Sequence, residues 1–495
     1  METASATPPT ARALFKNMLK GSSLYMIAMA SPNLLSLILL PIVTSRLSTA
    51  DYGALDLLQQ VTVVVSVLFG ANFSAALGYF YFEEGAHKSR VVGTTLLGAL
   101  LMGALAGSVG WMVSEPISVH VFYSPAYVPF LHLIFVAMPL GFLLDGAMGW
   151  LRIEDRATLF TGAVLLRLIL ILIGTLTLLL GLGLRIGAVL GANVAAGSIL
   201  ALVLAATALR FHGLSFDRAL FVRLWRFSLP MTLSAMALFV IHFGDRFILP
   251  RYRPLADLGV YAVAYKLGML LTPLQTAFEA YWSSQAYQIV KRPDAATVFA
   301  RTFTYLALVL SAVGLGVLLA TRPALRILTT PAYSRAAALV PIILAAYFIR
   351  ALGDFFRIVF LAKGLPSHDA ACNGIAAAVS LVSYFVLIPP YGIAGAAVAT
   401  LLTFVVAFAV SYVWSCRVWR FPLEAERLMK LAVVTGAICL VYFAIPRGGS
   451  AAEIARAILL WLAFPGLLLL WRFPSPGEMD LIRSLRGRVV AYCPW

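Results

Sequence analysis

The chain has 495 residues, of which 61% are hydrophobic and only 12% are charged. Water-soluble globular proteins are about 45–50% apolar and about 25% charged, so this composition excludes a water-soluble enzyme. The apolar residues form long unbroken runs rather than alternating segments of about ten residues, which excludes an outer-membrane barrel. The formal net charge of +16 does not indicate nucleic-acid binding, because the basic residues lie between the apolar runs and build no basic domain.

Apolar runs of about 20 residues predict fourteen membrane-spanning helices, with gaps too short for a soluble domain. Arg12, Lys16 and Lys20 precede the first run, which is longer than a signal-peptide core and lacks a convincing cleavage site, so we expect an uncleaved first span. In chain order the predicted helices are residues 22–44, 54–78, 91–113, 127–149, 159–181, 185–209, 226–248, 258–280, 300–320, 336–361, 368–388, 391–414, 427–446 and 453–472.

The distribution of positive charge predicts the orientation of these spans. When the Lys and Arg residues near the ends of the spans are counted with the adjacent side, 23 of the 37 fall on the side of the N-terminus, 9 on the opposite side and 5 deep within the spans. Loops rich in Lys and Arg stay in the cytoplasm. We therefore expect a multi-pass protein of the inner (plasma) membrane with both termini in the cytoplasm.

The sequence offers no metal-binding or catalytic pattern. Its four cysteines have no metal-ligand spacing and sit in or beside apolar runs, so we interpret them as small hydrophobic residues: Cys372, Cys416, Cys439 and Cys493. We expect no catalytic residues, no metal and no cofactor. A proton, a sodium ion or the membrane potential could drive transport.

An internal repeat predicts the architecture. Residues 50–53 (ADYG) recur as residues 256–259 (ADLG), and residues 125–127 (PAY) recur as residues 331–333, each pair 206 positions apart. A looser match joins residues near 185–189 to residues near 393–397. The repeat unit is six helices, and an even number means that both copies cross the membrane in the same direction. This predicts two lobes related by an axis along the membrane normal, with a site between them.

The repeat also predicts how the chain divides into parts. Two six-helix lobes are followed by a helix pair that has no counterpart in the repeat, and cytoplasmic tails flank the whole. The predicted parts are an N-terminal tail (1–20), an N-lobe (21–212), a C-lobe (213–418), the extra helices 13 and 14 (419–473) and a C-terminal tail (474–495).

Three stretches of sequence resemble a known family. Residues 245–267 (DRFIL, then ADLGVYAVAYKL), residues 41–53 (PIVTSRL, then DYG) and residues 390–400 (PYGIAGAAVAT) are similar to motifs of the polysaccharide transporter family. These are the Wzx-type flippases of lipid-linked oligosaccharides in the multidrug/oligosaccharidyl-lipid/polysaccharide (MOP) superfamily. The resemblance covers about residues 15–415. It implies an all-α polytopic membrane protein with two six-helix lobes in the V-shaped arrangement of MOP and MATE transporters.

The helix count also resembles that of the lipid II flippases in the same superfamily, whose last two helices form a groove for the lipid tail. Those flippases carry arginines in helix 1, whereas residues 22–44 here carry no charge. This departure weakens a lipid II assignment.

Charged residues inside the predicted spans are candidates for a substrate site, because each costs about 2.5–3.5 kcal/mol near the bilayer centre. Arginine binds phosphate oxygens through a planar fork and lysine binds them as a point charge, so deep cations suit a lipid diphosphate. The candidates for this role are Lys266, Arg167, Arg350 and Arg246. The alternative for each is an interhelical ion pair.

Carboxylates nearby make that alternative concrete. Asp245 adjoins Arg246 and could pair with it, cap the corner or take part in ion coupling. Arg350, Asp354 and Arg357 fall at positions i, i+4 and i+7, on one helical face. We expect Asp354 to pair with one of the two arginines, which leaves at most the other one for substrate.

Uncharged polar residues in the spans allow two interpretations. Asn33, Asn72, Gln59 and Gln60 could line a hydrophilic lumen for sugar hydroxyl groups, or could hold helices together. Glycines at positions 103, 107 and 110 share one face of a helix and predict close helix packing.

Together these features lead to a functional hypothesis. We expect a flippase that moves an undecaprenyl-diphosphate-linked oligosaccharide across the inner membrane for O-antigen, capsule or exopolysaccharide biosynthesis, by alternating access around a cationic cavity. The alternatives are a MATE-like cation-coupled multidrug exporter and, less favoured, a membrane polysaccharide polymerase or ligase. The expected partners are the lipid-linked oligosaccharide, membrane lipids and the polymerase or export machinery of the same pathway, without nucleic acid.

Overall fold

The computed structural model describes residues 11–70, 73–85, 87–445 and 450–474, in which all regular structure is helical. Twelve helices in these ranges are long and apolar enough to cross a membrane. That number counts the bent helix α15 (Pro366–Val418) once and leaves out the 36-residue helix α1 (Ala11–Arg46). With α1 and both arms of α15 counted, the helices number the predicted fourteen, and the predicted all-α polytopic class is confirmed.

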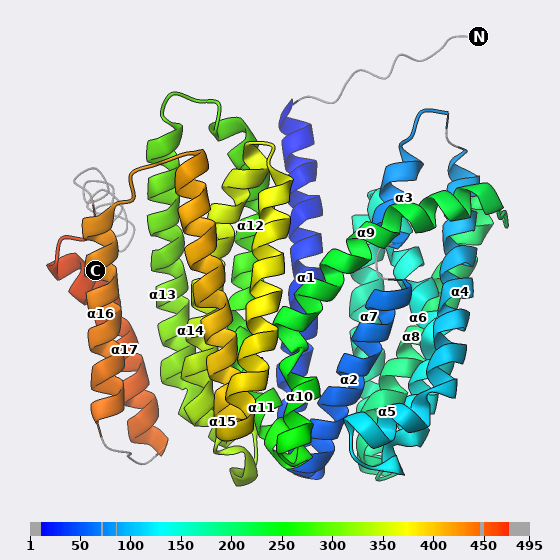
Figure 1. Cartoon of the computed structure of the whole chain (residues 1–495), viewed down its shortest axis with the longest axis horizontal. Coiled ribbons are helices and arrows are strands. Elements are labelled where there is room, and N and C mark those ends of the chain that lie inside the picture. Colours follow the sequence, from blue (N-terminus) through cyan, green and yellow to red (C-terminus); the bar gives the residue numbers. More distant parts are fainter. Residues whose placement is uncertain (1–10, 71–72, 86, 446–449, 475–495) are drawn as a thin grey trace, which may run out of the picture. The chain divides into compact units, whose positions relative to one another are not determined.

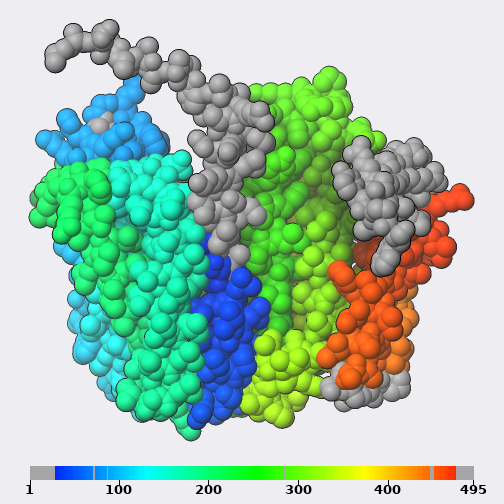
Figure 2. Space-filling view, turned by 180° about the vertical axis from the view of Figure 1, so that it is seen from behind, coloured from blue at the N-terminus to red at the C-terminus, as the bar shows by residue number. Residues whose placement is uncertain are grey.

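The chain forms two compact units, and the first contains the described residues up to Ala262 together with 328–333 and 377–399. In it α4, α6 and α8 pack side by side, α7 packs on α8, and α1 lies along α7 (Figures 1 and 2). Its helices are α1, α2 (Thr49–Phe69), α3 (Phe73–Tyr81), α4 (Lys88–Met112), α5 (Ser114–Val121), η1 (Pro125–Tyr127), α6 (Val128–Ile153), α7 (Ala157–Leu176), η2 (Thr177–Gly181), α8 (Arg185–His212), α9 (Arg218–Phe243), α10 (Asp245–Tyr252), the start of α11 (Leu255–Gly268), η4 (Pro331–Tyr333) and the middle of α15.

The glycine face of α4 explains its tight packing on α6. A Cβ atom at Gly103 would lie 2.8 Å from the carbonyl oxygen of Met138, and one at Gly107 would meet the carbonyl oxygen of Phe135. The two backbones therefore touch, as the spacing of these glycines predicts.

The second unit contains residues 263–327, 334–376 and the described residues from Thr400 onward. Its core contains a cluster of aromatic rings around Trp282, Phe299 and Phe355, with centroids 5.0–5.9 Å apart, in which Trp282 stacks on Phe355 and Phe299 meets both rings edge-on. Its helices are the end of α11, η3 (Met269–Leu271), α12 (Thr272–Ile289), α13 (Ala295–Leu328), α14 (Ala336–Ala362), the two ends of α15, α16 (Ala425–Ala444) and α17 (Ser450–Leu470).

Helices α16 and α17, the predicted extra pair, pack on each other and on α13 (Figure 2). The Trp461 indole donates a hydrogen bond of 2.9 Å to the carbonyl oxygen of Ala312, and Arg326 Nη1 lies 2.9 Å from the Glu453 carboxylate. Leu440, Leu459 and Leu470 on the opposite faces are exposed. The pair therefore has one face for the second unit and one apolar face that suits lipid.

The internal repeat appears directly in the contacts between α2 and α11. A Cβ atom at Gly53 would meet the carbonyl oxygen of Leu255, and one at Gly259 would meet that of Thr49. Each added Cβ would also lie within 3.0 Å of the other glycine's backbone nitrogen. Gly53 and Gly259 are 206 positions apart, as are Thr49 and Leu255. Equivalent residues of the two copies thus face each other in a reciprocal crossing. The predicted lobe boundaries stay a prediction.

The bend in α15 depends on Gly392. This residue has φ 57° and ψ −129°, a left-handed conformation that side chains with a Cβ rarely adopt. Pro389 and Pro390 precede it, and an added Cβ would lie 2.6 Å from Arg253 Nε. The PYGIAGAAVAT motif is therefore a bending element.

Candidate functional site

A cavity of about 320 Å³ opens among α2, α6, α7 and α8 of the first unit. Its size falls in the range of small-molecule sites, about 300–1,000 Å³. Its polar wall combines hydroxyl groups, amides, one carboxylate and one guanidinium, contributed by Gln59, Thr62, Ser66, Asp145, Arg167, Asn193 and Ser198.

Helical periodicity places the lining residues of α2 and of α6 each on one face of its helix. Gln59, Thr62 and Ser66 stand at positions i, i+3 and i+7 of α2, and Met138, Gly141 and Asp145 have the same spacing on α6. A polar stripe on an otherwise apolar span has to face the interior of a bundle.

Arg167 is the central cation of this cavity. It lies ten residues, or about 15 Å, from the start of α7, which is too deep to reach either membrane surface easily. Its Nε atom is buried and has no hydrogen-bond partner among the described residues, and no ion pair involving Arg167 occurs there. Its Nη2 atom lies beside Gly197, 3.9 Å from where a Cβ would stand. Asp145 lines the same cavity and interacts electrostatically with Arg167, whereas the Arg167 Nε donor has no partner among the described residues.

Arg246, another predicted diphosphate ligand, is engaged inside the first unit. Its side chain is 4% exposed, its Nε atom lies 3.0 Å from the Asp56 carboxylate, and its guanidinium lies over the Phe243 ring. Asp245 accepts a hydrogen bond from the Tyr261 hydroxyl. These contacts favour the ion-pair interpretation of Arg246.

Asp354 of α14 is the centre of an ionic network in the second unit. It lies 2.9 Å from Arg357 Nη1 and 3.4 Å from Arg350 Nε. Arg357 also holds Asp369 at 2.6 Å, and the Gln275 amide donates to Asp354 at 2.5 Å. The carboxylate thus binds Arg357 more closely than Arg350.

Two further predicted diphosphate ligands, Arg350 and Lys266, lie in the second unit and are partly exposed. The Arg350 side chain is 24% exposed and its guanidinium lies 5.8 Å from the rings of Tyr347 and Phe404. Lys266, in α11, is half-buried. Its neighbour Tyr265 packs edge-on against the same Tyr347 ring. Arg350 is therefore the arginine that Asp354 leaves more available.

The uncharged polar residues predicted to line a lumen lie in different environments where the structure describes them. Gln59 lines the first-unit cavity, whereas Asn33 is exposed on α1. Gln60 is buried, and its Oε1 atom lacks a hydrogen-bond partner within the described ranges. Asn72 lies outside the described residues.

The prediction of site residues missed several polar groups that the structure places beside the predicted ones. Thr62, Ser66, Asn193 and Ser198 line the cavity around Arg167, and Asp56 pairs with Arg246. Thr62 and Ser66 follow Gln59 by three and seven residues and so share its face of α2, and this spacing could have indicated the polar wall from the sequence. Asp56 could not be paired with Arg246 without knowing how the helices cross.

Several proteins of known structure have a similar architecture. The lipid II flippase MurJ in an inward closed conformation is 14% identical over 92% of this chain and 99% of its own, with a TM-score of 0.74. An inward-facing multidrug resistance MATE family transporter is 14% identical over 77% of this chain and 93% of its own, with a TM-score of 0.60. A MOP superfamily transporter from Pyrococcus furiosus is 14% identical over 80% of this chain and 94% of its own, with a TM-score of 0.59.

Likeness at such identity shows the fold, which is that of MOP superfamily transporters. A search of the curated proteins finds no match by sequence. The family described as polysaccharide biosynthesis protein matches residues 18–278, more than half of the chain. This match spans the cavity, the Gly53–Gly259 crossing and the motifs on α10 and α11. The chain therefore belongs to the polysaccharide biosynthesis protein family, as a multi-pass membrane protein with the MOP superfamily fold.

Proposed function

We propose that this protein is a flippase that carries an undecaprenyl-diphosphate-linked oligosaccharide across the inner membrane for O-antigen, capsule or exopolysaccharide biosynthesis. The observation that carries the proposal is Arg167, a deep cation in a polar cavity whose Nε atom has no partner in the described part of the chain. Membership of a polysaccharide biosynthesis family and a fold shared with a lipid II flippase support it. Both termini face the cytoplasm in this proposal.

The chemistry of the substrate explains the choice of residues. A lipid diphosphate carries negative charges that the membrane interior cannot solvate, so its passage requires cations. Arg167 supplies one in the first unit, and Lys266 and Arg350 supply two in the second. Hydroxyl and amide groups around Arg167 suit the hydroxyl groups of sugars.

Charge-removing variants test this proposal. Lys266→Ala and Arg167→Ala should each abolish or strongly reduce export, and Lys266→Arg should retain part of it. Loss of one charge-assisted contact corresponds to about 1.5–3 kcal/mol, or roughly 10–150-fold in binding. The measurement is complementation of polysaccharide export at matched protein level in the membrane. Arg292→Ala, on an exposed turn where Arg292 pairs with Asp294, is the control. Normal export by the double variant Lys266→Ala, Arg167→Ala would refute the cationic site.

A steric variant tests the cavity itself. Gly141 lines the cavity and a Cβ there meets nothing within 4 Å, so Gly141→Phe should fill it and block export. Gly162→Phe on α7 is the matched control, because its Cβ also meets open space and it does not line the cavity. Equal export by the two variants would remove the cavity from the transport path.

Asp145 favours a second candidate function, a cation-coupled drug exporter, because a carboxylate in the same cavity could bind a cation. Reconstituted vesicles distinguish the two. A flippase moves labelled lipid-linked sugar between leaflets, whereas an exporter accumulates a cationic drug without doing so. The same assay, with sugar polymerisation as a further readout, separates a transporter from a polymerase.

A further inference from the structure

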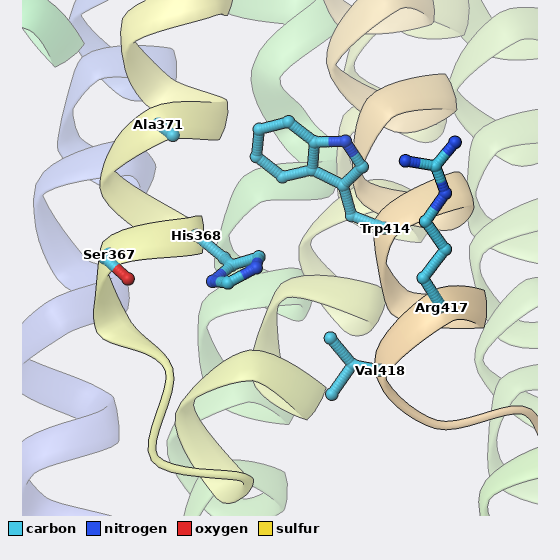
Figure 3. Close-up of a pocket in the computed structure, with 6 residues that line it drawn as sticks. All are labelled: Ser367, His368, Ala371, Trp414, Arg417 and Val418. Carbon is cyan, nitrogen blue, oxygen red and sulfur yellow. The ribbon is translucent and has the colours of Figure 1, made fainter.

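A second cavity, of about 420 Å³, lies between the two ends of α15 in the second unit. Ser367, His368 and Ala371 line it from the first arm, and Trp414, Arg417 and Val418 line it from the second (Figure 3). None of these residues belongs to the proposed transport site.

Packing fixes the walls of this cavity. The His368 ring meets the Trp414 indole edge-on at 5.7 Å between centroids, and its other neighbour is Phe360, also at 5.7 Å. Ser411 and Cys372 join the two arms by a contact of 3.7 Å from hydroxyl to sulfur. These contacts hold the Trp414 indole in place as one wall of the cavity.

The charge at the cavity is positive. Arg417 is exposed and forms no ion pair within the described part of the chain, and no carboxylate lines the cavity. Asp369, next to His368 in sequence, is held by Arg357 at 2.6 Å.

The cavity sits between the beginning and the end of α15. Trp and Arg at helix ends mark the level of lipid headgroups, and a guanidinium binds phosphate oxygens bidentately. We propose that this cavity binds the phosphate of an anionic phospholipid headgroup, with Arg417 as the phosphate ligand and the Trp414 indole against the glycerol and upper acyl chain. This is a site for a resident membrane lipid, separate from the transported substrate.

Native mass spectrometry of the full-length protein, titrated with phosphatidylglycerol and with phosphatidylcholine, tests the assignment. Arg417→Gln should weaken phosphatidylglycerol binding more than tenfold. Arg420→Gln is the matched control, because Arg420 lies three residues further on, is exposed and does not line the cavity. One surface charge contributes about fivefold to binding of anionic lipid, so the control should lose no more than that. Equal losses in the two variants would overturn the site in favour of general surface charge.

A second pair of variants tests the cavity without changing charge. Ala371→Trp should fill the cavity and prevent binding, whereas Gly374→Trp, one turn along the same arm and facing open space, should not. Retained phosphatidylglycerol binding by Ala371→Trp would contradict the proposal. Inorganic phosphate and undecaprenyl diphosphate serve as competitors. Displacement of phosphatidylglycerol by inorganic phosphate at equal concentration would refute a lipid site, and preferential binding of the diphosphate would reassign the cavity to the transport substrate.

Discussion

Gly392 shows how a single residue sets the path of a membrane helix. Its positive φ angle disfavours any residue with a Cβ atom, and such an atom would also displace the Arg253 side chain. An L-residue held in such a conformation costs about 1–3 kcal/mol. This stretch resembles a family motif in sequence, but the motif alone does not indicate that its glycine bends the chain.

Gly392→Ala should therefore lower the free energy of unfolding by about 1–3 kcal/mol. Gly374→Ala is the control, because Gly374 is helical and open, where alanine is favoured by up to about 1 kcal/mol. Thermal unfolding of the purified variants in one detergent measures both. An unchanged melting temperature in Gly392→Ala would contradict the assigned strain.

Glu154, in the short connection between α6 and α7, gathers several donors. It lies 2.8 Å from Arg156 Nε and 2.7 Å from His212 Nε2, and it accepts a hydrogen bond from the Tyr81 hydroxyl at 3.1 Å. Partial burial raises the pKa of this carboxyl, but hydrogen bonds from Trp150, Tyr81 and His212 and the charge of Arg156 outweigh it, so the pKa lies below its usual range.

A lowered pKa predicts a direction for the effect of pH. The folded form favours ionised Glu154, so its contribution is present above the unfolded pKa and is lost as pH falls through the folded pKa. Glu154→Gln should reduce stability at neutral pH and flatten the acid side of the profile of melting temperature against pH. Glu84→Gln, in an exposed turn, should leave the profile unchanged. A profile of Glu154→Gln that is parallel to the wild type would contradict this role.

At the scale of elements, hydropathy predicted where spans occur better than where they break. The predicted helix 226–248 is interrupted at Gly244, between α9 and α10, and the predicted helix 54–78 contains the end of α2 at Phe69. The average hydropathy of a window of about 20 residues stays high across both breaks, so it does not register the short polar stretches at which the helices end. The deep charges were found from sequence because charge is rare in spans, whereas their partners on other helices depend on packing.

The contact between α13 and α17 allows an asymmetric prediction. Glu453 is 3% exposed, whereas the side chain of its partner Arg326 is 48% exposed. Arg326→Ala leaves a buried carboxylate without its ion pair, which costs about 3–5 kcal/mol. Glu453→Gln leaves Arg326 in contact with solvent and should cost less. Thermal unfolding of both, and of the double variant, measures the order.

If Glu453→Gln lowers the melting temperature as much as Arg326→Ala does, the burial of Glu453 does not explain the stability cost of breaking this ion pair. The double variant should recover part of the loss, because the uncharged amide that Glu453→Gln introduces tolerates burial better than an isolated carboxylate.

At the scale of the whole molecule, the charge count predicts the topology. With 23 basic residues on one side and 9 on the other, both termini should be cytoplasmic. A reporter that works only in the cytoplasm should be active when it is fused to the C-terminus. A reporter that works only in the periplasm should be active when it is inserted at Tyr123, between α5 and η1. Periplasmic activity of the C-terminal fusion would overturn the orientation.

The Gly53–Gly259 crossing bears on how the two copies of the repeat can diverge. Duplicated halves of a gene usually accumulate substitutions independently, since each copy has its own neighbours. Here each glycine accommodates the backbone of the other copy, so a side chain in either one displaces both. Because the atoms in the way belong to the backbone, no substitution in one copy can make room for a side chain in the other, and the two positions are constrained together to remain glycine.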